Sequence, residues 1–472
     1  MQEAHGARMH INDFTGKRVH MIGIGGSSMS GLAGLLARRG FAVTGSDNYD
    51  SYHVQAVRES GIPVTIGHQA ENVHGAALVI YSAAIAPDNP ERQEAARLGI
   101  PQMERATLLG QLMEGYAQAA GISGTHGKTT TTAMLAKILV DCGLDPAVHI
   151  GGDYDYIGGS TRQGAHNVFV AEACEFHSSF LQMRPTVAVV LNIEEDHLDY
   201  YKDLNAIVEA FGQFVARVQE GGVFIGNGDD ENVLRLMGTA ACRCETFGFG
   251  AACDWQAQGL TTDEEGHPSF TLSYRGEPIA PLTLRVAGRF NVLNALAALA
   301  AAHALGADMQ KSCAALCSFE NVHRRFELTS VTDGVKVYHD YGHNPVEMAG
   351  ALSVACLQKH NKLWAVMQPH TFSRVKRLFK DYIHCCDAAD EILITDICAA
   401  REKDPGDINS RMLVDAIAAT GQNVHHTPTF DDTEAYLRTH WQPGDLVLTM
   451  GCGNINVLNE QIKRHGDTAG RV

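Results

Sequence analysis

The sequence has few of the features that would place it in a membrane or on a nucleic acid. No run of about 18 apolar residues occurs in the chain of 472 residues, so no membrane span is expected. The N-terminal segment lacks the apolar stretch of a signal peptide, and we therefore expect a cytoplasmic protein. Lys and Arg total 37 against 54 Asp and Glu, which leaves a formal charge of −17. A basic surface that binds nucleic acid is not expected against that background.

Paired cysteine motifs are also missing. The 12 cysteines are scattered and form no CxxC pattern, so we expect free thiols rather than disulfides or a zinc site. Internal repeats and low-complexity segments are absent as well. A chain of this length predicts two to four domains, at roughly 100–200 residues per domain.

Apolar strands alternate with helical segments along the whole chain. Residues 18–26 read as a strand that runs into glycines, and the segment 29–40 after them reads as a helix. Further strands are expected at 41–47 and at 77–85. Strands and helices in alternation are typical of parallel sheets, and we predict an α/β fold. The pattern restarts twice, which predicts three α/β domains: 1–117, 118–324 and 325–472.

The stretch GTHGKTTTTAML, residues 124–135, has the pattern of a phosphate-binding loop. A glycine-rich turn between a strand and a helix directs backbone N–H groups at one point, and the helix N-terminus adds positive charge. Lys128 would contact the β- and γ-phosphates, and Thr129 would bind Mg²⁺. Ile122 stands where the strict motif has glycine. The alternative is a Gly- and Thr-rich helix start without a ligand.

Acidic residues and a histidine follow two later strands. Glu172 ends the strand NVFVAEA and Glu175 comes shortly after it, while His197 ends the segment TVAVVLNIEEDH. Ligands of open parallel sheets bind at the carboxyl ends of strands, so these groups could meet the phosphate loop. Carboxylate oxygens suit Mg²⁺, and histidine is a less usual ligand. The pattern alone leaves open a solvated acidic loop with an ordinary histidine.

Taken together, these motifs resemble those of a known family. The segments GTHGKTTT, AEACE, NIEEDHLDYY, GRFNVLNALAA, RRFE and DYGHNP are similar to those of the ATP-dependent Mur ligases of peptidoglycan synthesis. The resemblance covers nearly the whole chain. It implies a Rossmann-like N-terminal domain for a UDP-sugar, a central P-loop ATPase domain, and a Rossmann-like C-terminal domain for an amino acid.

Within the family, the segments VHMIGIGGSSMSGLA and MQPHTFSR are similar to those of the members that join L-alanine to UDP-N-acetylmuramate. Small-molecule substrates, ATP and Mg²⁺ are thereby implied. A recycling ligase that adds a tripeptide to the same UDP-sugar shares most of the motifs and stays an alternative. Other Mur ligases carry a lysine where this chain has Phe211, so they fit less well.

The resemblance also implies roles for particular residues. The catalytic groups would be Lys128, Glu172, His197, Arg325 and His343. Thr129 and Glu172 would bind one Mg²⁺, and Glu172 and His197 would approach a second. The ATP-binding residues would be Gly124, Thr125, His126, Gly127, Lys128, Thr129, Thr130, Asn291, Asn294, Arg325 and Asp340. The UDP-sugar site would contain Gly23, Gly25, Gly26, Ser27, Ser28, Asp47 and Ser82, and the amino-acid site Tyr341, His343 and Arg374.

Three residues depart from the family pattern around the amino-acid site. Asn344, Thr371 and Lys376 stand where many relatives have histidine or arginine. The carboxylate of the amino acid would therefore have fewer guanidinium partners.

The N-terminal glycine turn has a second interpretation from a different class of protein. Its pattern nearly matches the dinucleotide fingerprint GxGxxG, with Asp47 at the end of the next strand, as in a nicotinamide-dependent dehydrogenase. Ser28 stands where that fingerprint has a third glycine or alanine, and a single fingerprint is a weak signal. The same turn could hold the diphosphate of a UDP-sugar.

Overall fold

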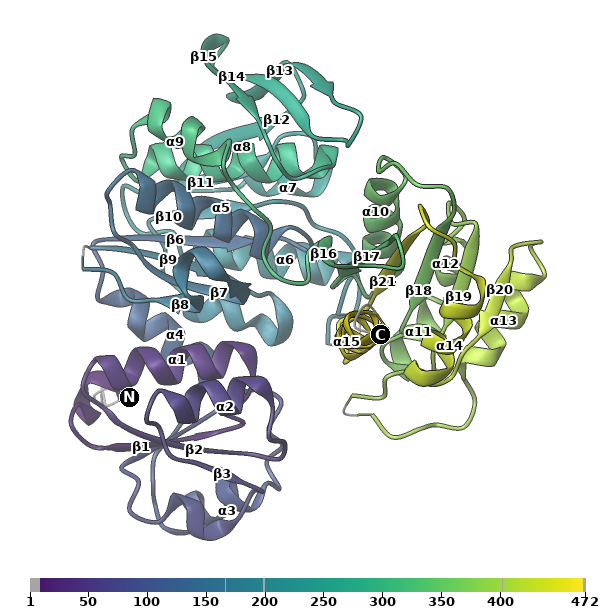
Figure 1. Ribbon diagram of the computed structural model, residues 1–472. Coiled ribbons are helices and arrows are strands. Elements are labelled where there is room, and N and C mark those ends of the chain that lie inside the picture. The colour runs from purple at the N-terminus through teal and green to yellow at the C-terminus, as the bar shows by residue number, and fades with distance from the viewer. Residues whose placement is uncertain (1–8, 166, 198–199, 401, 470–472) are drawn as a thin grey trace. The chain divides into compact units, whose positions relative to one another are not determined.

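The strands form three sheets in the computed structural model, which describes residues 9–165, 167–197, 200–400 and 402–469 (Figure 1). By compactness the chain divides into two units. The first holds Met1–Gly259, Phe270–Thr283 and Phe290–Phe319. The second holds Leu260–Ser269, Leu284–Arg289 and Glu320–Val472.

The N-terminal sheet, drawn in purple in Figure 1, has the strand order β3-β2-β1-β4-β5 and is parallel throughout. The order reverses between β1 and β4, and ligands of such sheets bind at that point. Its strands are β1 (Arg18–Ile22), β2 (Ala42–Asp47), β3 (Val64–Ile66), β4 (Leu78–Tyr81) and β5 (Gln102–Glu104). Its helices are η1 (Ile11–Phe14), α1 (Ser27–Arg38), α2 (Tyr52–Glu59), η2 (Ala70–Val73), α3 (Pro90–Arg97) and α4 (Arg105–Glu114).

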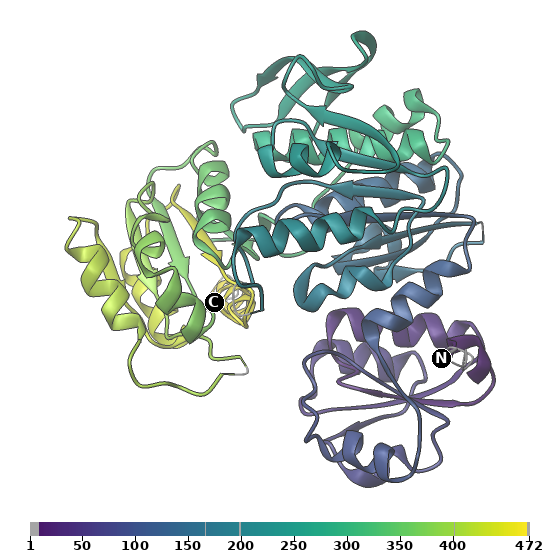
Figure 2. The same cartoon turned by 180° about the vertical axis from the view of Figure 1, so that it is seen from behind.

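The middle sheet has the order β15-β14-β13-β12-β11-β10-β6-β9-β7-β8, with the phosphate-loop strand β6 between β10 and β9. Figure 2 shows the protein from behind. Its first strands are β6 (Gln118–Ser123), β7 (Ala147–Tyr154), β8 (Gly159–Arg162), β9 (Val168–Glu172) and β10 (Val187–Val190). The later ones are β11 (Val223–Asn227), β12 (Arg243–Gly248), β13 (Trp255–Thr262), β14 (Pro268–Tyr274) and β15 (Glu277–Thr283). The helices are α5 (Lys128–Asp141), η3 (Asp155–Ile157), η4 (Phe176–Gln182), α6 (Leu204–Val215), α7 (Glu231–Met237), α8 (Arg289–Ala304) and α9 (Met309–Leu316).

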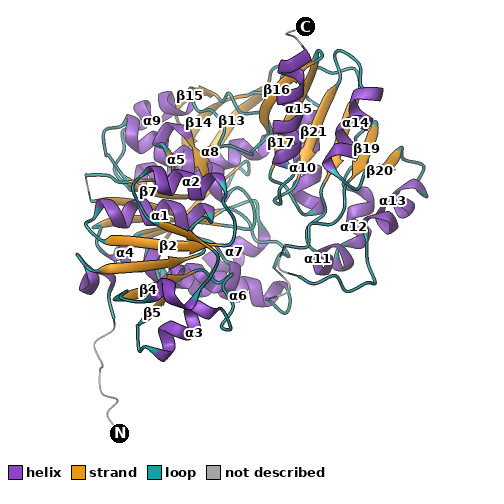
Figure 3. Ribbon diagram, turned by 60° about the horizontal axis from the view of Figure 1, so that its bottom comes forward, coloured by secondary structure: helices purple, strands orange, loops and turns teal. Residues whose placement is uncertain are grey.

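The sheet of the second unit has the order β16-β17-β21-β18-β19-β20, and the edge strand β16 is antiparallel to β17. Figure 3 shows helices, in purple, packed along its orange strands. The strands are β16 (Glu327–Thr332), β17 (Val335–Asp340), β18 (Leu363–Met367), β19 (Glu391–Ile394), β20 (Val424–His426) and β21 (Leu446–Met450). The helices are α10 (Pro345–Ala355), α11 (Phe372–Arg377), α12 (Phe379–His384), α13 (Ser410–Ala418), α14 (Phe430–His440) and α15 (Asn456–Ala469).

The apolar strands form as expected because parallel strands are covered by helices on both faces. In β18 and β21, for example, all residues are buried. The predicted α/β class is confirmed by the three sheets. Two expected strands are shorter in the structure, because β4 ends at Tyr81 and β10 ends at Val190. The residues after Val190 form a loop that leads to His197.

The sequence predicted no membrane-spanning helix and no paired cysteines. No helix within the described residues is both long and apolar enough to cross a bilayer. The cysteines are free thiols of varied burial, from the buried Cys253 to the exposed Cys356.

Candidate active site

The predicted phosphate loop connects β6 to helix α5. Gly124 and Gly127 adopt positive φ angles of 144° and 84°, and Gly127 is the N-cap of α5. Side chains are excluded at both positions by space as well, since a Cβ at Gly124 would lie 2.9 Å from Leu191 Cβ. The turn leaves the first N–H groups of a 14-residue helix without intrahelical partners, which is the geometry that binds a phosphate.

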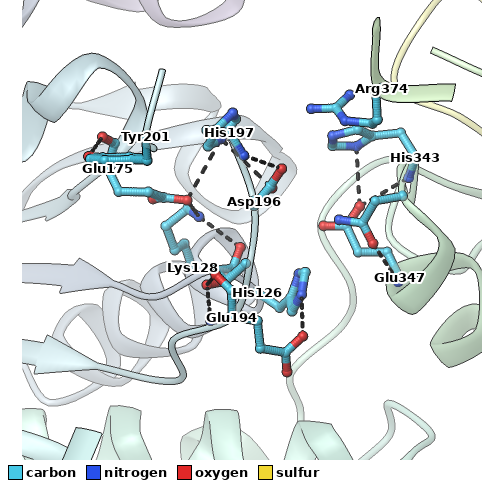
Figure 4. Close-up of polar contacts among 12 residues, drawn as sticks. His126, Lys128, Glu175, Glu194, Asp196, His197, Tyr201, His343, Glu347 and Arg374 are labelled. Carbon is cyan, nitrogen blue, oxygen red and sulfur yellow. Dashed lines mark hydrogen bonds and ion pairs between the residues drawn. The ribbon is translucent and has the colours of Figure 1, made fainter. Parts of the chain in front are cut away.

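Lys128, the first residue of α5, turns its ammonium back over the loop (Figure 4). Its Nζ donates hydrogen bonds to the carbonyl oxygens of Gly124 and Thr125. A third hydrogen bond runs to Glu175 Oε1 at 3.0 Å. Burial by itself would lower the pKa of Lys128, but the carboxylates of Glu175 and Glu172 raise it above its ordinary value. The side chain is therefore charged, as phosphate binding requires.

Thr129 and Glu172 form the predicted pair of oxygen ligands. Thr129 Oγ1 donates to Glu172 Oε2 at 3.0 Å, and the backbone N–H of Gly151 donates to the same oxygen at 2.8 Å. A hydroxyl and a carboxylate beside a phosphate loop match the ligands that Mg²⁺ prefers. Within the described residues, no group of three or more His, Cys, Asp and Glu side chains is arranged to hold a metal ion. An ion held here would take its other ligands from phosphate and water.

Glu175 lies in the same cluster, although the predicted site did not include it. It is 2% exposed, and its Oε1 lies 3.0 Å from Lys128 Nζ and 3.8 Å from His197 Nε2 (Figure 4). Its Oε2 is buried and has no hydrogen-bond partner among the residues that the structure describes, while its backbone carbonyl accepts a hydrogen bond from the Tyr201 hydroxyl. The signal for it in the sequence was its position three residues after Glu172, at the end of the same strand.

His197 reaches this cluster from the loop after β10 and not from a strand end. It has a positive φ of 49°, and its ring lies 4.7 Å from that of Phe176. Its Nε2 is 3.8 Å from both Glu175 and Asp196. The structure thus brings His197 beside the phosphate loop, with Glu175 as the group between it and Lys128.

The rest of the loop is held by the residues that follow β10. The backbone N–H of Thr125 donates to the Asn192 carbonyl at 3.1 Å, and that of His126 donates to Asn192 Oδ1 at 2.7 Å. His126 Nε2 lies 3.2 Å from Glu194 Oε2 (Figure 4). Thr130 is buried in the first turn of α5. These bonds fix the part of the loop between Gly124 and Gly127 to the segment that follows β10.

Asn291 and Asn294 pack against the loop from helix α8. Both are buried, and Asn294 Nδ2 donates to Asn291 Oδ1 at 3.0 Å. Thr131 Oγ1 donates to Asn294 Oδ1 at 3.2 Å. A Cβ on Gly127 would lie 2.5 Å from the same Oδ1. Of the two asparagines predicted to contact ATP, Asn294 lies directly beside the predicted phosphate loop, and Asn291 is hydrogen-bonded to Asn294.

The N-terminal glycine turn lies at the reversal point of the first sheet. Gly23 has a φ of 74°, and Gly26 is the N-cap of α1. The N–H of Gly25 donates to Asp47 Oδ2 at 2.9 Å, so the acid at the end of β2 holds the turn. A Cβ on Gly25 would come within 2.5 Å of Val54 Cγ2. The turn is therefore a rigid support for the N-terminus of α1.

Two serines open α1 beside this turn. Ser27 is its first residue, and Ser28 Oγ lies 2.8 Å from His149 Nε2. Arg105 Nη1 donates to the same Ser28 hydroxyl at 3.3 Å. Burial, with the nearby Arg105, lowers the pKa of His149 to about 3, so this histidine is neutral. Ser82 begins the turn after β4, on the other side of the reversal point.

In the second unit, Asp340 ends β17 and is held by backbone groups. Its Oδ2 accepts from the Phe326 N–H at 2.9 Å and its Oδ1 from the Gly342 N–H at 2.7 Å. Burial raises the pKa of the Asp340 carboxyl, and Arg325 opposes this effect. The Arg325 guanidinium lies over the Tyr341 ring, 4.9 Å from its centroid. Asp340, Arg325 and Tyr341, all of which are predicted site residues, are thus neighbours within this unit.

Arg324 has a structural role beside Arg325. Its Nη2 donates to the carbonyl oxygens of Gly451 and Gly453, at 3.1 and 3.0 Å. Its Nε donates to His339 Nε2 at 3.0 Å, so that nitrogen carries no proton. Because Arg324 is used in this way, Arg325 is the better candidate for phosphate contact.

The predicted amino-acid residues also lie together in the second unit. His343 Nδ1 is 3.2 Å from Glu347 Oε2, which also accepts from the His343 N–H at 3.0 Å (Figure 4). The His343 ring lies 5.8 Å from that of Tyr341 and 6.1 Å from that of His370. Arg374 Nη1 donates to the His370 carbonyl at 3.0 Å. His370 therefore connects Arg374 to His343.

The three departures from the family pattern have local partners. Asn344 caps helix α10 with its side chain, and Thr371 Oγ1 donates to Glu402 Oε1 at 2.7 Å. Lys376 pairs with Asp407. These side chains support the second unit's loops rather than adding charge around His343.

Comparison with known proteins decides the family. Family models match residues 18–117 ("Mur ligase family, catalytic domain"), 122–302 ("Mur ligase middle domain") and 324–453 ("Mur ligase, glutamate ligase domain"). The chain belongs to the Mur ligase family. A UDP-N-acetylmuramate–L-alanine ligase from Acetivibrio thermocellus is 44% identical over 445 residues, which cover 94% of this chain and 95% of that protein.

Solved Mur ligase structures have the same fold. The crystal structure of a UDP-N-acetylmuramate-alanine ligase from Thermotoga maritima matches 96% of this chain and 100% of that chain, with a TM-score of 0.82 and 26% identity. A murein peptide ligase from Psychrobacter arcticus matches 95% of this chain and 98% of that one, with a TM-score of 0.75. At 24% identity the latter match shows the fold alone. Membership of this family decides against the dehydrogenase interpretation of the N-terminal turn.

Proposed function

We propose that this chain is an ATP-dependent ligase that joins L-alanine to the lactyl carboxylate of UDP-N-acetylmuramate in peptidoglycan synthesis. One observation carries the proposal: Lys128, Thr129 and Glu172 meet at a phosphate loop in a chain 44% identical to an L-alanine ligase over 94% of its length. The recycling ligase that adds a tripeptide is less well supported, because a solved ligase of that kind is 31% identical over 65% of this chain, below the 44% over 94% for the L-alanine ligase.

ATP supplies the driving force for amide formation. An oxygen of the lactyl carboxylate attacks the γ-phosphorus, the bond to the β-γ bridging oxygen breaks, and ADP leaves. The amine of alanine then attacks the acyl carbon of the acyl phosphate, loses a proton, and inorganic phosphate leaves. Charge develops on the phosphoryl oxygens during the first step, where a fixed ammonium stabilises it. Lys128 is proposed to supply that ammonium.

The residues beside Lys128 fit a magnesium ion. Thr129 and Glu172 would hold it through their oxygens, and His197 is proposed to contribute at a second position. Bound Mg²⁺ neutralises charge on the phosphates during transfer. These residues also help to fix the position of the loop, because Thr129 and Glu172 are hydrogen-bonded to each other.

The three sheets are proposed to divide the substrates, with limits at residues 117 and 324. The glycine turn with Ser27, Ser28, Asp47 and Ser82 would bind the UDP-sugar. The middle sheet would bind ATP, and the second unit's Tyr341, His343 and Arg374 would contact alanine, with Arg325 and Asp340 contributing to the ATP site. His343 would orient the ammonium of alanine or help to deprotonate it. The cytoplasmic location expected from the sequence stays a prediction.

An assay with purified protein tests the proposal. The protein is incubated with ATP, Mg²⁺ and UDP-N-acetylmuramate, and L-alanine, L-serine, glycine or the tripeptide is offered in separate reactions. Mass spectrometry should detect the L-alanine product, with one ADP formed per amide. A tripeptide product in place of the alanine product would identify the recycling ligase instead.

The acyl phosphate has a test of its own. With ¹⁸O in the bridge between the β- and γ-phosphates, reversible cleavage lets the β-phosphate rotate and scrambles the label. Scrambling should need Mg²⁺ and UDP-N-acetylmuramate but not L-alanine. Borohydride should also trap the intermediate as the muramyl alcohol. An enzyme that makes the amide but gives neither signal would refute the acyl-phosphate route.

A further inference from the structure

Strand β7 carries one residue that contacts two proposed sites. β7 pairs with β9 up to His149, and its pairing with β8 shifts register between His149 and Tyr154. Gly151 lies in that interval. Its N–H donates to Glu172 Oε2 at 2.8 Å, and its carbonyl accepts from Ser27 Oγ at 3.1 Å.

These bonds form a continuous path through the first unit. It runs from Ser27 at the N-terminus of α1, through Gly151, to Glu172 Oε2, which also accepts from Thr129 Oγ1 at 3.0 Å. One end of the path is the proposed UDP-sugar turn, and the other is the proposed metal pair. The bonds of Gly151 and Thr129 to Glu172 have ordinary lengths, and the bond from Ser27 to Gly151, at 3.1 Å, is slightly long for an O–H···O bond.

A side chain at Gly151 would meet the carboxylate of Glu172. A Cβ there would lie 2.7 Å from Glu172 Oε2 and 3.0 Å from Oε1. Gly151 is not among the glycines with positive φ, so its backbone could accept alanine without conformational strain. An added methyl group would therefore act by displacing the carboxylate of Glu172.

Helix α1 is packed closely enough to make this path stiff. Ser160 Oγ donates to the Ser27 carbonyl at 3.2 Å, and Thr161 Oγ1 donates to the Gly31 carbonyl at 3.1 Å. A Cβ on Gly31 would lie 2.5 Å from Thr161 Cγ2, so helix and hairpin touch backbone to side chain. The contact between α1 and the β7–β8 hairpin is therefore too close to absorb a shift of the N-terminus of α1.

We propose that Gly151 is a positioning residue that couples sugar-nucleotide binding at the Ser27 turn to the orientation of Glu172, and so to binding of Mg²⁺-nucleotide. The inference rests on the function proposed above. The Ser27 hydroxyl has one proton, which it donates to the Gly151 carbonyl. A phosphate oxygen at the N-terminus of α1 would compete for that proton, which would change the hydrogen bonding of Gly151 and of the carboxylate that it holds.

Isothermal titration calorimetry on the full chain measures this coupling. The dissociation constant of UDP-N-acetylmuramate is determined with and without Mg²⁺ and a non-hydrolysable ATP analogue, and the ratio of the two constants measures the coupling. The reverse titration, of the Mg²⁺-analogue complex with and without UDP-N-acetylmuramate, must give the same ratio. The wild-type ratio should differ from one by about fivefold or more, within the usual range for coupled sites. Gly151→Ala and Ser27→Ala should both bring it close to one. Gly151→Ala should also weaken binding of the Mg²⁺-analogue complex.

Two further variants separate positioning from general damage. In Gly212→Ala, the new Cβ would have Leu236 Cδ2 at 3.6 Å, an ordinary contact, so the wild-type ratio should be retained. The effects of Gly151→Ala and Glu172→Gln on Mg²⁺-analogue affinity should be non-additive, because both act on one carboxylate. If Gly151→Ala does not fold, Ser27→Ala decides, since it cuts the same path without adding volume.

The outcomes keep the two proposals apart. A wild-type ratio of one, or a ratio that Ser27→Ala and a folded Gly151→Ala both retain, overturns the coupling while leaving the ligase function intact. A wild-type protein that binds neither UDP-N-acetylmuramate nor the analogue overturns the proposed function itself.

Discussion

Replacement of Glu175 by glutamine should tighten nucleotide binding, although the residue lies inside the site. In the structure the three donors of Lys128 Nζ go to Gly124, Thr125 and Glu175. A phosphate can be bound only if one of these bonds is given up. The bond to Glu175 is the charged one, and it holds the ammonium as a phosphate oxygen would. Glu175 therefore competes with ATP for Lys128.

The size of the effect follows from the difference between two hydrogen bonds. A hydrogen bond to a charged group contributes about 1.5–3 kcal/mol, and the bond to Glu175 adds the attraction of a second, opposite charge, which glutamine removes. Glutamine keeps the size of the side chain and can still offer a carbonyl oxygen to Lys128. The competing bond should therefore weaken by about 0.5–2 kcal/mol, which corresponds to an affinity for nucleotide about twofold to thirtyfold higher.

Two measurements check this expectation. Calorimetry with a non-hydrolysable ATP analogue gives the dissociation constant. Thermal unfolding should show a lower melting temperature for Glu175→Gln without nucleotide and a larger rise when the analogue is added. Glu194→Gln is the matched control, because the Glu194 side chain is 45% exposed and pairs with His126 at 3.2 Å. A surface pair of this kind contributes little, so its nucleotide affinity should stay within about twofold of wild type.

Weaker or unchanged nucleotide binding in Glu175→Gln would refute the reasoning. Weaker binding would mean that the carboxylate still helps to hold Lys128, or contacts the metal, once nucleotide is bound. Unchanged binding would mean that Lys128 does not leave Glu175 when the phosphates arrive.

Lys128, the proposed metal ligands and the buried His339 each give a further prediction. Lys128→Ala should lower kcat for ligation by at least about 100-fold, because a fixed positive charge on the phosphoryl oxygens is lost; turnover near wild type would exclude Lys128 from catalysis. Glu172→Gln should raise the Mg²⁺ concentration needed for half-maximal rate by about tenfold to a hundredfold, and His197→Ala by less; unchanged Mg²⁺ titrations in both would contradict the metal assignment. Burial and Arg324 lower the pKa of His339 to about 3, against 6.5 in the unfolded chain. The unfolded state therefore binds the extra proton, and about 2 kcal/mol of stability should be lost between pH 7 and pH 5. Urea unfolding of His339→Gln should show a smaller loss, and an equal loss would count against this origin.

Local patterns in the sequence were sufficient for much of this protein. The α/β class follows from alternating apolar strands and helices, because each parallel strand needs a helical return. The phosphate loop follows from Gly124, Gly127 and Lys128, since a glycine turn before a helix fixes its geometry within a few residues. Glu172 was found because it ends a strand, and strand ends gather at one edge of a parallel sheet.

Only the tertiary structure decided which of these groups touch. Glu175 is 47 positions from Lys128, and Asn294 is 163 positions from Thr131. These contacts depend on β6 lying between β10 and β9, and on α8 placing Asn294 beside Thr131 of α5, which no local periodicity encodes. The same holds for Gly151, whose role is set by the space beside Glu172. Strand and turn signals act over a few residues, whereas the order of strands is selected by burial of the whole sheet.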